Sequence, residues 1–152
     1  MRQYADILAF DKDGQLALVA EVKSKLGTSS DWAAKMRRNM FAHGSVPNAP
    51  FFLLALPDSF YLWENTGRTS EIVEPTQKVN PQPFLQPLFG LTDASYQDLT
   101  EKSFELVVTS WLNQVLRAQS PQDLLEDNQD WLVSSGLFEK LTGGHLALEA
   151  VA

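Results

Sequence analysis

The sequence contains no cysteine, which excludes a disulfide framework, a thiol nucleophile and a thiolate metal site. Its two histidines stand far apart, so a histidine-based metal centre is not expected either. No apolar run approaches the roughly 20 residues of a membrane-spanning helix, and the N-terminus lacks the apolar stretch of a signal peptide. These absences predict a cytoplasmic protein with no membrane partner.

Positive charge is also scarce. The formal net charge is −7 and the pI is about 4.7, which argues against a protein that coats nucleic acid by bulk attraction. The charges are unevenly distributed, however. From Lys12 to Arg38 there are six basic and three acidic residues, whereas from Asp93 to Ala152 there are three basic and ten acidic residues. Any contact with nucleic acid is therefore expected from the first third of the chain.

Apolar residues are frequent enough for a folded core, at 44% hydrophobic and 11% aromatic over 152 residues. Four prolines between Glu74 and Phe89 predict an extended connector without regular structure. We therefore expect an α/β core over residues 1–74, a proline-rich connector over residues 75–90, and a C-terminal helical segment over residues 91–152 that packs on the core.

The segment Ala5–Lys25 predicts a β-hairpin. Tyr4–Phe10 is mostly apolar, Asp11–Gly14 is a turn signal that ends in glycine, and Leu16–Val22 is again mostly apolar. A run of this kind is typical of a strand that is covered on both faces.

The rest of the core predicts a helix and a second hairpin. Ser29 or Ser30 can cap the N-terminus of the helix, and Gly44 is its expected C-terminal stop. Phe51–Leu56 and Phe60–Glu64 follow as two short apolar strands around a turn. The alternating aromatic residues of the second strand, Tyr61 and Trp63, either stack on bases or belong to the core, and the alternation favours the core.

The C-terminal segment predicts mainly helix. Tyr96–Arg117 is the clearest long helix, and its broad apolar face is either core or a seam for a second copy of the chain or a protein partner. A helix over Trp131–Leu141, interrupted near Ser134–Gly136, is expected next. Gly143 and Gly144 end it, and we expect the last residues to fray.

The first hairpin brings three charged side chains together. Glu21 and Lys23 are two residues apart on one strand, so they point to the same face, and the turn places Asp6 across from them. Two converging carboxylates suit Mg²⁺, which leaves room for phosphate oxygens and can polarise a phosphodiester. The adjacent ammonium group would orient the attacking water or stabilise charge on the phosphate. The alternative is a salt-bridged strand end, in which Lys23 neutralises both acids.

Further basic residues follow this site along the chain. They either contact a phosphate backbone or form the solvated face of the first helix. These nucleic-acid-binding candidates are Lys25, Lys35, Arg37 and Arg38.

Three runs carry a family resemblance: ADILAFDKDGQLALVAEVKSK, DWAAKMRRNMFAHG and PFFLLALPDSFYLW. Together they resemble the PD-(D/E)XK nuclease superfamily over about Tyr4–Glu64. The chain looks most like the small restriction-endonuclease-like proteins common in cyanobacteria, which are related to nuclease domains of type I restriction subunits. The resemblance implies an α/β fold with a restriction-endonuclease-like mixed sheet flanked by helices. It also implies Mg²⁺- or Mn²⁺-dependent hydrolysis of DNA phosphodiester bonds.

The superfamily pattern falls on the first hairpin, with its metal-binding Asp at Asp6, its Glu at Glu21 and its Lys at Lys23. Ala5 stands where the pattern has a proline, which is not a ligand. The superfamily core has a helix before its first strand that often adds an acidic residue near the metal, yet only five residues precede Asp6. We therefore expect the C-terminal helices or a partner to complete the fold. The alternative is a catalytically inactive scaffold or a regulatory subunit that binds protein.

Overall fold

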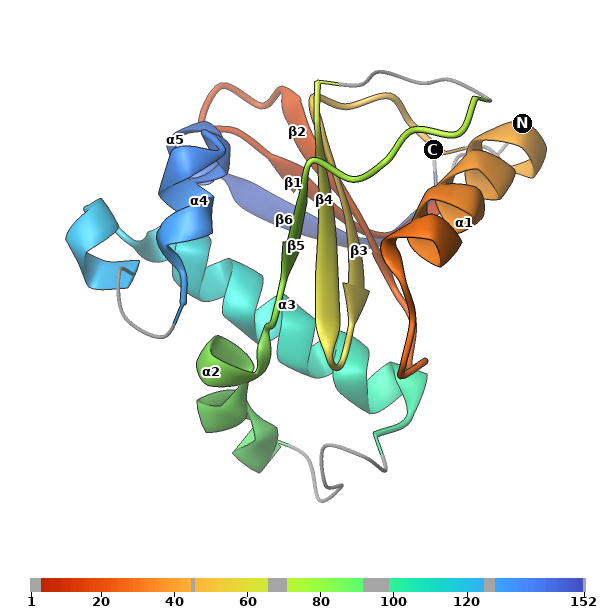
Figure 1. Cartoon of the computed structure of the whole chain (residues 1–152). Coiled ribbons are helices and arrows are strands. Elements are labelled where there is room, and N and C mark those ends of the chain that lie inside the picture. The colour runs from red at the N-terminus through yellow and green to blue at the C-terminus, as the bar shows by residue number, and fades with distance from the viewer. Residues whose placement is uncertain (1–3, 45, 66–70, 92–98, 125–127, 152) are drawn as a thin grey trace.

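The computed structural model describes residues 4–44, 46–65, 71–91, 99–124 and 128–151. These residues form an α/β fold in which helices cover both faces of one mixed β-sheet (Figure 1). The strands are β1 (Tyr4–Phe10), β2 (Leu16–Val22), β3 (Phe51–Leu56), β4 (Ser59–Glu64), β5 (Gln77–Val79) and β6 (His145–Val151). The helices are α1 (Ser30–His43), α2 (Gln82–Leu85), α3 (Glu101–Arg117), α4 (Asp130–Ser134) and α5 (Leu137–Leu141), with short 3-10 helices η1 (Gln86–Leu91) and η3 (Pro121–Leu124).

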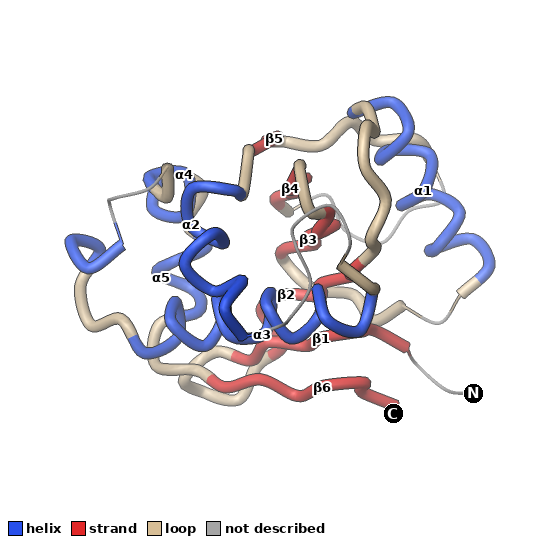
Figure 2. The backbone as a smooth tube through the Cα atoms, turned by 90° about the horizontal axis from the view of Figure 1, so that it is seen from below, coloured by secondary structure: helices blue, strands red, loops and turns tan. Residues whose placement is uncertain are grey.

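The six strands lie in the order β5-β4-β3-β2-β1-β6. Strands β2 and β3 are parallel, and every other neighbouring pair is antiparallel. Parallel neighbours need a crossover connection, and α1 supplies it. Strands β5 and β6 are the opposite edges of the sheet, as Figure 2 shows from below.

The predicted first hairpin is confirmed, and its turn explains its register. The N–H of Gly14 donates to the carbonyl of Asp11 at 3.0 Å, and Gly14 has a φ of +80° that glycine adopts without strain. Both the N–H of Asp13 and the N–H of Gln15 donate to Oδ1 of Asp11 at 2.9 Å. The strands then pair from Phe10 opposite Leu16, through a bulge, to Ile7 opposite Ala20.

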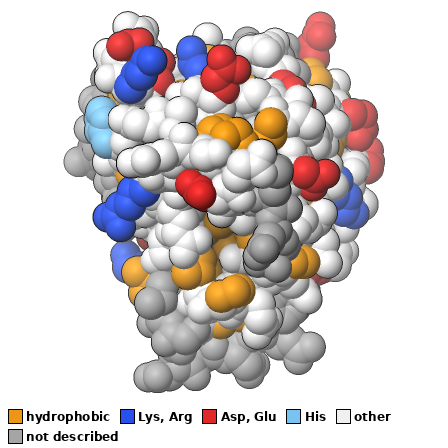
Figure 3. All heavy atoms as spheres, turned by 90° about the vertical axis from the view of Figure 1, so that its left-hand side faces the viewer, with side chains coloured by type: hydrophobic (Ala, Val, Ile, Leu, Met, Phe, Trp, Pro, Cys, Tyr) orange, Lys and Arg blue, Asp and Glu red, His pale blue; other side chains and the backbone are white. Residues whose placement is uncertain are grey.

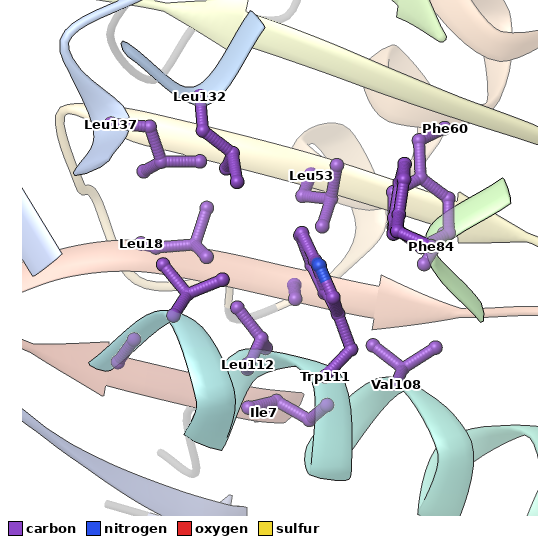
Figure 4. Close-up of a cluster of buried hydrophobic side chains, with 14 of the residues drawn as sticks. Ile7, Leu18, Leu53, Phe60, Phe84, Val108, Trp111, Leu112, Leu132 and Leu137 are labelled. Atoms are coloured by element: carbon purple, nitrogen blue, oxygen red, sulfur yellow. The ribbon is translucent and has the colours of Figure 1, made fainter. Parts of the chain in front are cut away.

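One face of the sheet packs against α2, α3, α4 and α5. Trp111 of α3 is fully buried at the centre of this core, where it contacts the rings of Phe60 and Phe84 (Figure 4). Its indole N–H donates to Oε1 of Gln129 at 2.9 Å, so the burial leaves no unsatisfied donor. The apolar face predicted for this helix is buried within the chain, which makes it core.

The other face of the sheet packs against α1. The helix begins after Ser29, whose side chain accepts the N–H of Trp32 at 3.1 Å, and it ends at Gly44. Tyr61 and Trp63 of β4 are completely buried on this face. The prediction that they belong to the core is therefore confirmed, and they are not placed to stack on bases.

Two predictions about the second half of the chain are wrong. The proline-rich connector is not devoid of regular structure, since β5, α2 and η1 lie within it. The prolines are tolerated because the strand has only three residues at the sheet edge and the helices are short. The residues after Gly144 do not fray: His145–Val151 form β6 along the free edge of β1.

The start of the longest helix also differs from the prediction. Residues 92–98 lie outside the described residues, and α3 begins at Glu101, after Thr100 caps it by accepting the N–H of Ser103 at 3.0 Å. The interruption predicted near Ser134–Gly136 is confirmed, because it separates α4 from α5. Within the described ranges, no helix is both long and apolar enough to cross a membrane.

Candidate active site

The open end of the β1–β2 hairpin holds two carboxyl groups side by side. The backbone N–H of Val22 donates to Oδ2 of Asp6 at 2.8 Å, and the backbone N–H of Asp6 donates to Oε1 of Glu21 at 3.3 Å. The two carboxyl groups are close enough for the charge of Asp6 to act on Glu21. Each carboxyl group is thus anchored to the partner strand through one oxygen, and the predicted convergence of Asp6 and Glu21 is observed.

The Glu21 carboxyl is placed at an electrostatic cost. Its residue is only 8% exposed. Burial, followed by the nearby charge of Asp6, raises the pKa of Glu21 from 4.5 to about 8. A proton on Glu21 therefore relieves the repulsion between the two groups at neutral pH, and a divalent cation is the other species that can do so.

Lys23 directly follows β2, two residues beyond Glu21. It is half-buried, and its backbone N–H donates to the carbonyl of Ala55 at 3.1 Å, which extends the pairing of β2 with β3. Its positive charge lowers the pKa of Glu21, although this effect is smaller than the opposing effects of burial and Asp6. The charge of Lys23 therefore offsets only part of the unfavourable environment of Glu21.

A pocket of about 210 Å³ opens next to this pair. One wall is formed by Asp6 and Val22, and the other is formed by the first two turns of α3, through Glu101, Lys102 and Glu105. Our reading of the sequence did not include these α3 residues in the site. The sequence signal for them is a pair of acids, Glu101 and Glu105, which lie four residues apart near the start of the predicted long helix. At this spacing the two acids share one helix face.

The C-terminal half of the chain completes this end of the sheet. Helix α3 covers the pocket, and β6 pairs with β1 along its whole length, with Tyr4 opposite Val151. The two ends of the described chain are therefore neighbours in the sheet (Figure 2). One C-terminal helix and a C-terminal strand that had not been predicted therefore pack at this end of the sheet.

The predicted nucleic-acid-binding residues do not form one surface. Arg37 is 2% exposed and lies against the rings of Phe41, Phe52 and Trp63, at 4.6, 5.6 and 5.4 Å from its guanidinium carbon. Burial lowers the pKa of Arg37 to about 10. Its role as a phosphate contact is therefore wrong, because cation–π packing holds it inside the core.

The other three candidates remain at the surface. Lys35 is ion-paired with Asp31 at 3.1 Å across one helical turn, and Lys25 lies 5.9 Å above the ring of Trp32. Arg38 is partly exposed and donates to Oδ1 of Asn39 at 3.3 Å. These contacts leave all three within reach of solvent, so they stay candidates for contact with a phosphate backbone.

The two carboxyl groups suit a hard divalent cation that keeps several of its water ligands. They do not form a site in which protein atoms supply every ligand. Among the described residues, no three His, Cys, Asp or Glu side chains converge into a metal-ligand group. Asp6 and Glu21 offer two carboxylates, and Mg²⁺ is commonly held by one or two carboxylates while it keeps several waters. No protein-family model, curated protein or solved structure gives a significant match to the chain. Evidence for a function therefore comes from the site itself.

A second pocket, of about 360 Å³, lies at the other end of the hairpin. Its charged lining residues come from the turn and from α5: Asp11, Lys12, Asp13, Glu139 and Lys140. The molecular face at the left of Figure 1 carries acidic and basic side chains interspersed (Figure 3). Because opposite charges alternate there and Asp11 already accepts two backbone N–H groups, this pocket does not resemble a metal centre.

Proposed function

We propose that the chain is a Mg²⁺- or Mn²⁺-dependent DNA endonuclease with a restriction-endonuclease-like fold. The observation that carries the proposal is the Asp6–Glu21 pair, two carboxyl groups that lie side by side at a strand end, each hydrogen-bonded to the partner strand, with Lys23 two residues beyond Glu21. A buried like-charge pair of this kind is costly to maintain, and such pairs cluster at functional sites.

The arrangement of the strands and helices supports the same proposal. Taken in the order α3, β6, β1, β2, α1 and β3, the elements give a helix, three antiparallel strands, a crossover helix and a parallel strand. This order contains a helix and a strand from the C-terminal half of the chain, and the nuclease resemblance calls for a helix before Asp6. They reach this position because β6 runs beside β1. We infer that the acids of α3 take the part of the additional acidic residue that the resemblance expects near the metal.

In this proposal Asp6 and Glu21 hold the cation, and Glu101 and Glu105 line the pocket beside it. When bound there, Mg²⁺ or Mn²⁺ supplies positive charge that polarises the phosphodiester and acidifies a water molecule. Lys23 positions that water or stabilises charge on the phosphate. The oxygen of water forms the new bond to phosphorus, the bond to the sugar oxygen breaks, and the proton lost by the water is returned through solvent to the leaving oxygen.

Cleavage of supercoiled plasmid in Mg²⁺ or Mn²⁺ tests the proposal directly. We expect the wild-type protein to nick or linearise the plasmid, and EDTA to stop it. Glu21→Ala and Lys23→Ala should each lower the initial rate by at least about 100-fold, because one removes a cation ligand and the other a charge at the reacting phosphate.

Asp13→Asn and Lys12→Ala are matched controls, since both residues are exposed at the turn end of the same hairpin. We expect both controls to cleave at the wild-type rate. Cleavage that survives both Glu21→Ala and Lys23→Ala would remove this site from the mechanism. A folded wild-type protein that cleaves nothing would favour the scaffold or regulatory function instead.

A further inference from the structure

Lys102 is the one basic side chain among the described residues that line the pocket beside Asp6. It is exposed and projects from the first turn of α3, on the wall across from β1 and β2. Positive charge in the first turn of a helix is disfavoured by the helix dipole, whereas the neighbouring Glu101 is favoured there.

The charges around the pocket indicate a role for Lys102. Four carboxyl groups lie at the site, on Asp6, Glu21, Glu101 and Glu105. One divalent cation and Lys23 together do not neutralise four ionised carboxylates, so an approaching phosphodiester would still meet net negative charge. Lys102 supplies the missing positive charge on the side of the pocket where Lys23 is absent.

We propose that Lys102 binds a non-bridging oxygen of the phosphodiester that is cleaved, so that α3 contributes a substrate-binding residue to a site otherwise built on β1 and β2. This inference rests on the proposed nuclease function. Because negative charge on the phosphate increases as water attacks, the contact strengthens in the transition state and acts more on kcat than on KM.

The test compares wild type, Lys102→Gln and Lys102→Arg, with Lys12→Gln as a matched control that removes an exposed lysine far from the site. The substrate is a short DNA duplex in Mg²⁺, and Mn²⁺ affinity is measured by calorimetry without DNA. We expect Lys102→Gln to lower kcat by about 10- to 100-fold, and Lys102→Arg to restore most of the loss. The slope of log(kcat/KM) against log[salt] should also become shallower by roughly one.

The metal measurement separates a phosphate contact from a structural role. Removing a positive charge from an acidic pocket should leave Mn²⁺ affinity unchanged or make it tighter, and should leave the melting temperature unchanged. A kcat for Lys102→Gln equal to that of Lys12→Gln would overturn the inference. So would weaker Mn²⁺ binding in Lys102→Gln, or a loss of stability that Lys102→Arg does not rescue, because either result assigns Lys102 to the architecture of the helix.

Failure of the nuclease function itself gives a different result. A wild-type protein that neither binds Mn²⁺ nor cleaves the duplex overturns both the proposed function and this inference. A wild-type protein that does both, with Lys102→Gln indistinguishable from it, overturns this inference alone.

Discussion

The two ends of the β1–β2 hairpin bury an acid to nearly the same extent and treat it in opposite ways. Asp11, at the turn, is 9% exposed, and Glu21, at the open end, is 8% exposed. The pKa of Asp11 is lowered, chiefly by its hydrogen bond from the backbone of Gln15, whereas the pKa of Glu21 is raised to about 8. Burial is the largest cause of the raised pKa of Glu21, whereas a backbone hydrogen bond is the largest cause of the lowered pKa of Asp11.

The neighbours of the two acids also contribute to the difference between their pKa values. Asp11 accepts two backbone N–H groups on one oxygen, and Nζ of Lys140 lies 3.7 Å from the other. Glu21 accepts one longer hydrogen bond and faces a second carboxyl group. The first arrangement stabilises an anion and fixes a turn. The second is unfavourable without a proton or a cation, so we assign structure to the turn end and chemistry to the open end.

The largest effect that can sharpen this comparison is the pH dependence of stability. With its pKa raised from 4.5 to about 8, Glu21 keeps in the folded state a proton that the unfolded chain releases. Between these two pH values the free energy of unfolding therefore falls as the pH rises, by about 2–5 kcal/mol in total without metal. Glu21→Gln has no proton to lose and should flatten this dependence.

Denaturant titrations from pH 4.5 to 8.5 in EDTA measure the effect. Asp11→Asn is the control, because the lowered pKa of Asp11 places its own titration below this range. It should shift the whole curve without changing its slope between these pH values. If the free energy of unfolding of the wild-type protein did not change up to pH 8, this would contradict the difference between Asp11 and Glu21.

The second effect concerns the cation that can replace the proton on Glu21. At pH 8, Mg²⁺ or Mn²⁺ should stabilise the wild-type protein against thermal unfolding, by about 2.7 kcal/mol at a concentration 100 times the Kd. Glu21→Gln should lose most of this stabilisation, and Asp11→Asn should keep it. Equal stabilisation of all three proteins would place cation binding elsewhere on the molecule.

The sequence was sufficient for the open end of the hairpin because its information is local. Strand alternation and a glycine turn put Asp6, Glu21 and Lys23 in register, and no long-range contact was needed. The partners of the site were not predictable in the same way. Glu101 and Lys102 are about a hundred residues away from Asp6 along the chain, and only tertiary packing of α3 brings them to the pocket.

The same distinction between local and long-range contacts explains why the predictions for the last residues of the chain and for Arg37 were wrong. Strand β6 follows two glycines near the chain end, where local signals favour fraying, but the free edge of β1 supplies hydrogen bonds that stabilise it. Arg37 falls on a helix whose other basic residues are exposed, and three aromatic rings from α1, β3 and β4 enclose it. Neither environment is visible in a window of neighbouring residues.

A third and smaller effect tests the turn. Asp11→Ala should lower the melting temperature, because the N–H groups of Asp13 and Gln15 lose their side-chain acceptor. The rate of plasmid cleavage per folded molecule should stay at the wild-type value. A fall in cleavage to the level of Glu21→Ala would mean that the turn end shares in the chemistry, which would contradict the division that we draw.

The smallest effect concerns the lysine beside each acid. Lys140→Gln removes a partner whose side chain is 42% exposed and 3.7 Å from Asp11, so we expect a change in melting temperature of at most about 2 °C. Lys23→Gln should change the melting temperature at pH 5 just as little, since Glu21 is then protonated. It should, however, extend the stability decrease to a higher pH, because Lys23 lowers the pKa of Glu21 in the wild-type protein. A higher upper limit of the decrease in Lys23→Gln and no change in Lys140→Gln would show that only the open end couples a lysine to a proton which a metal ion can displace.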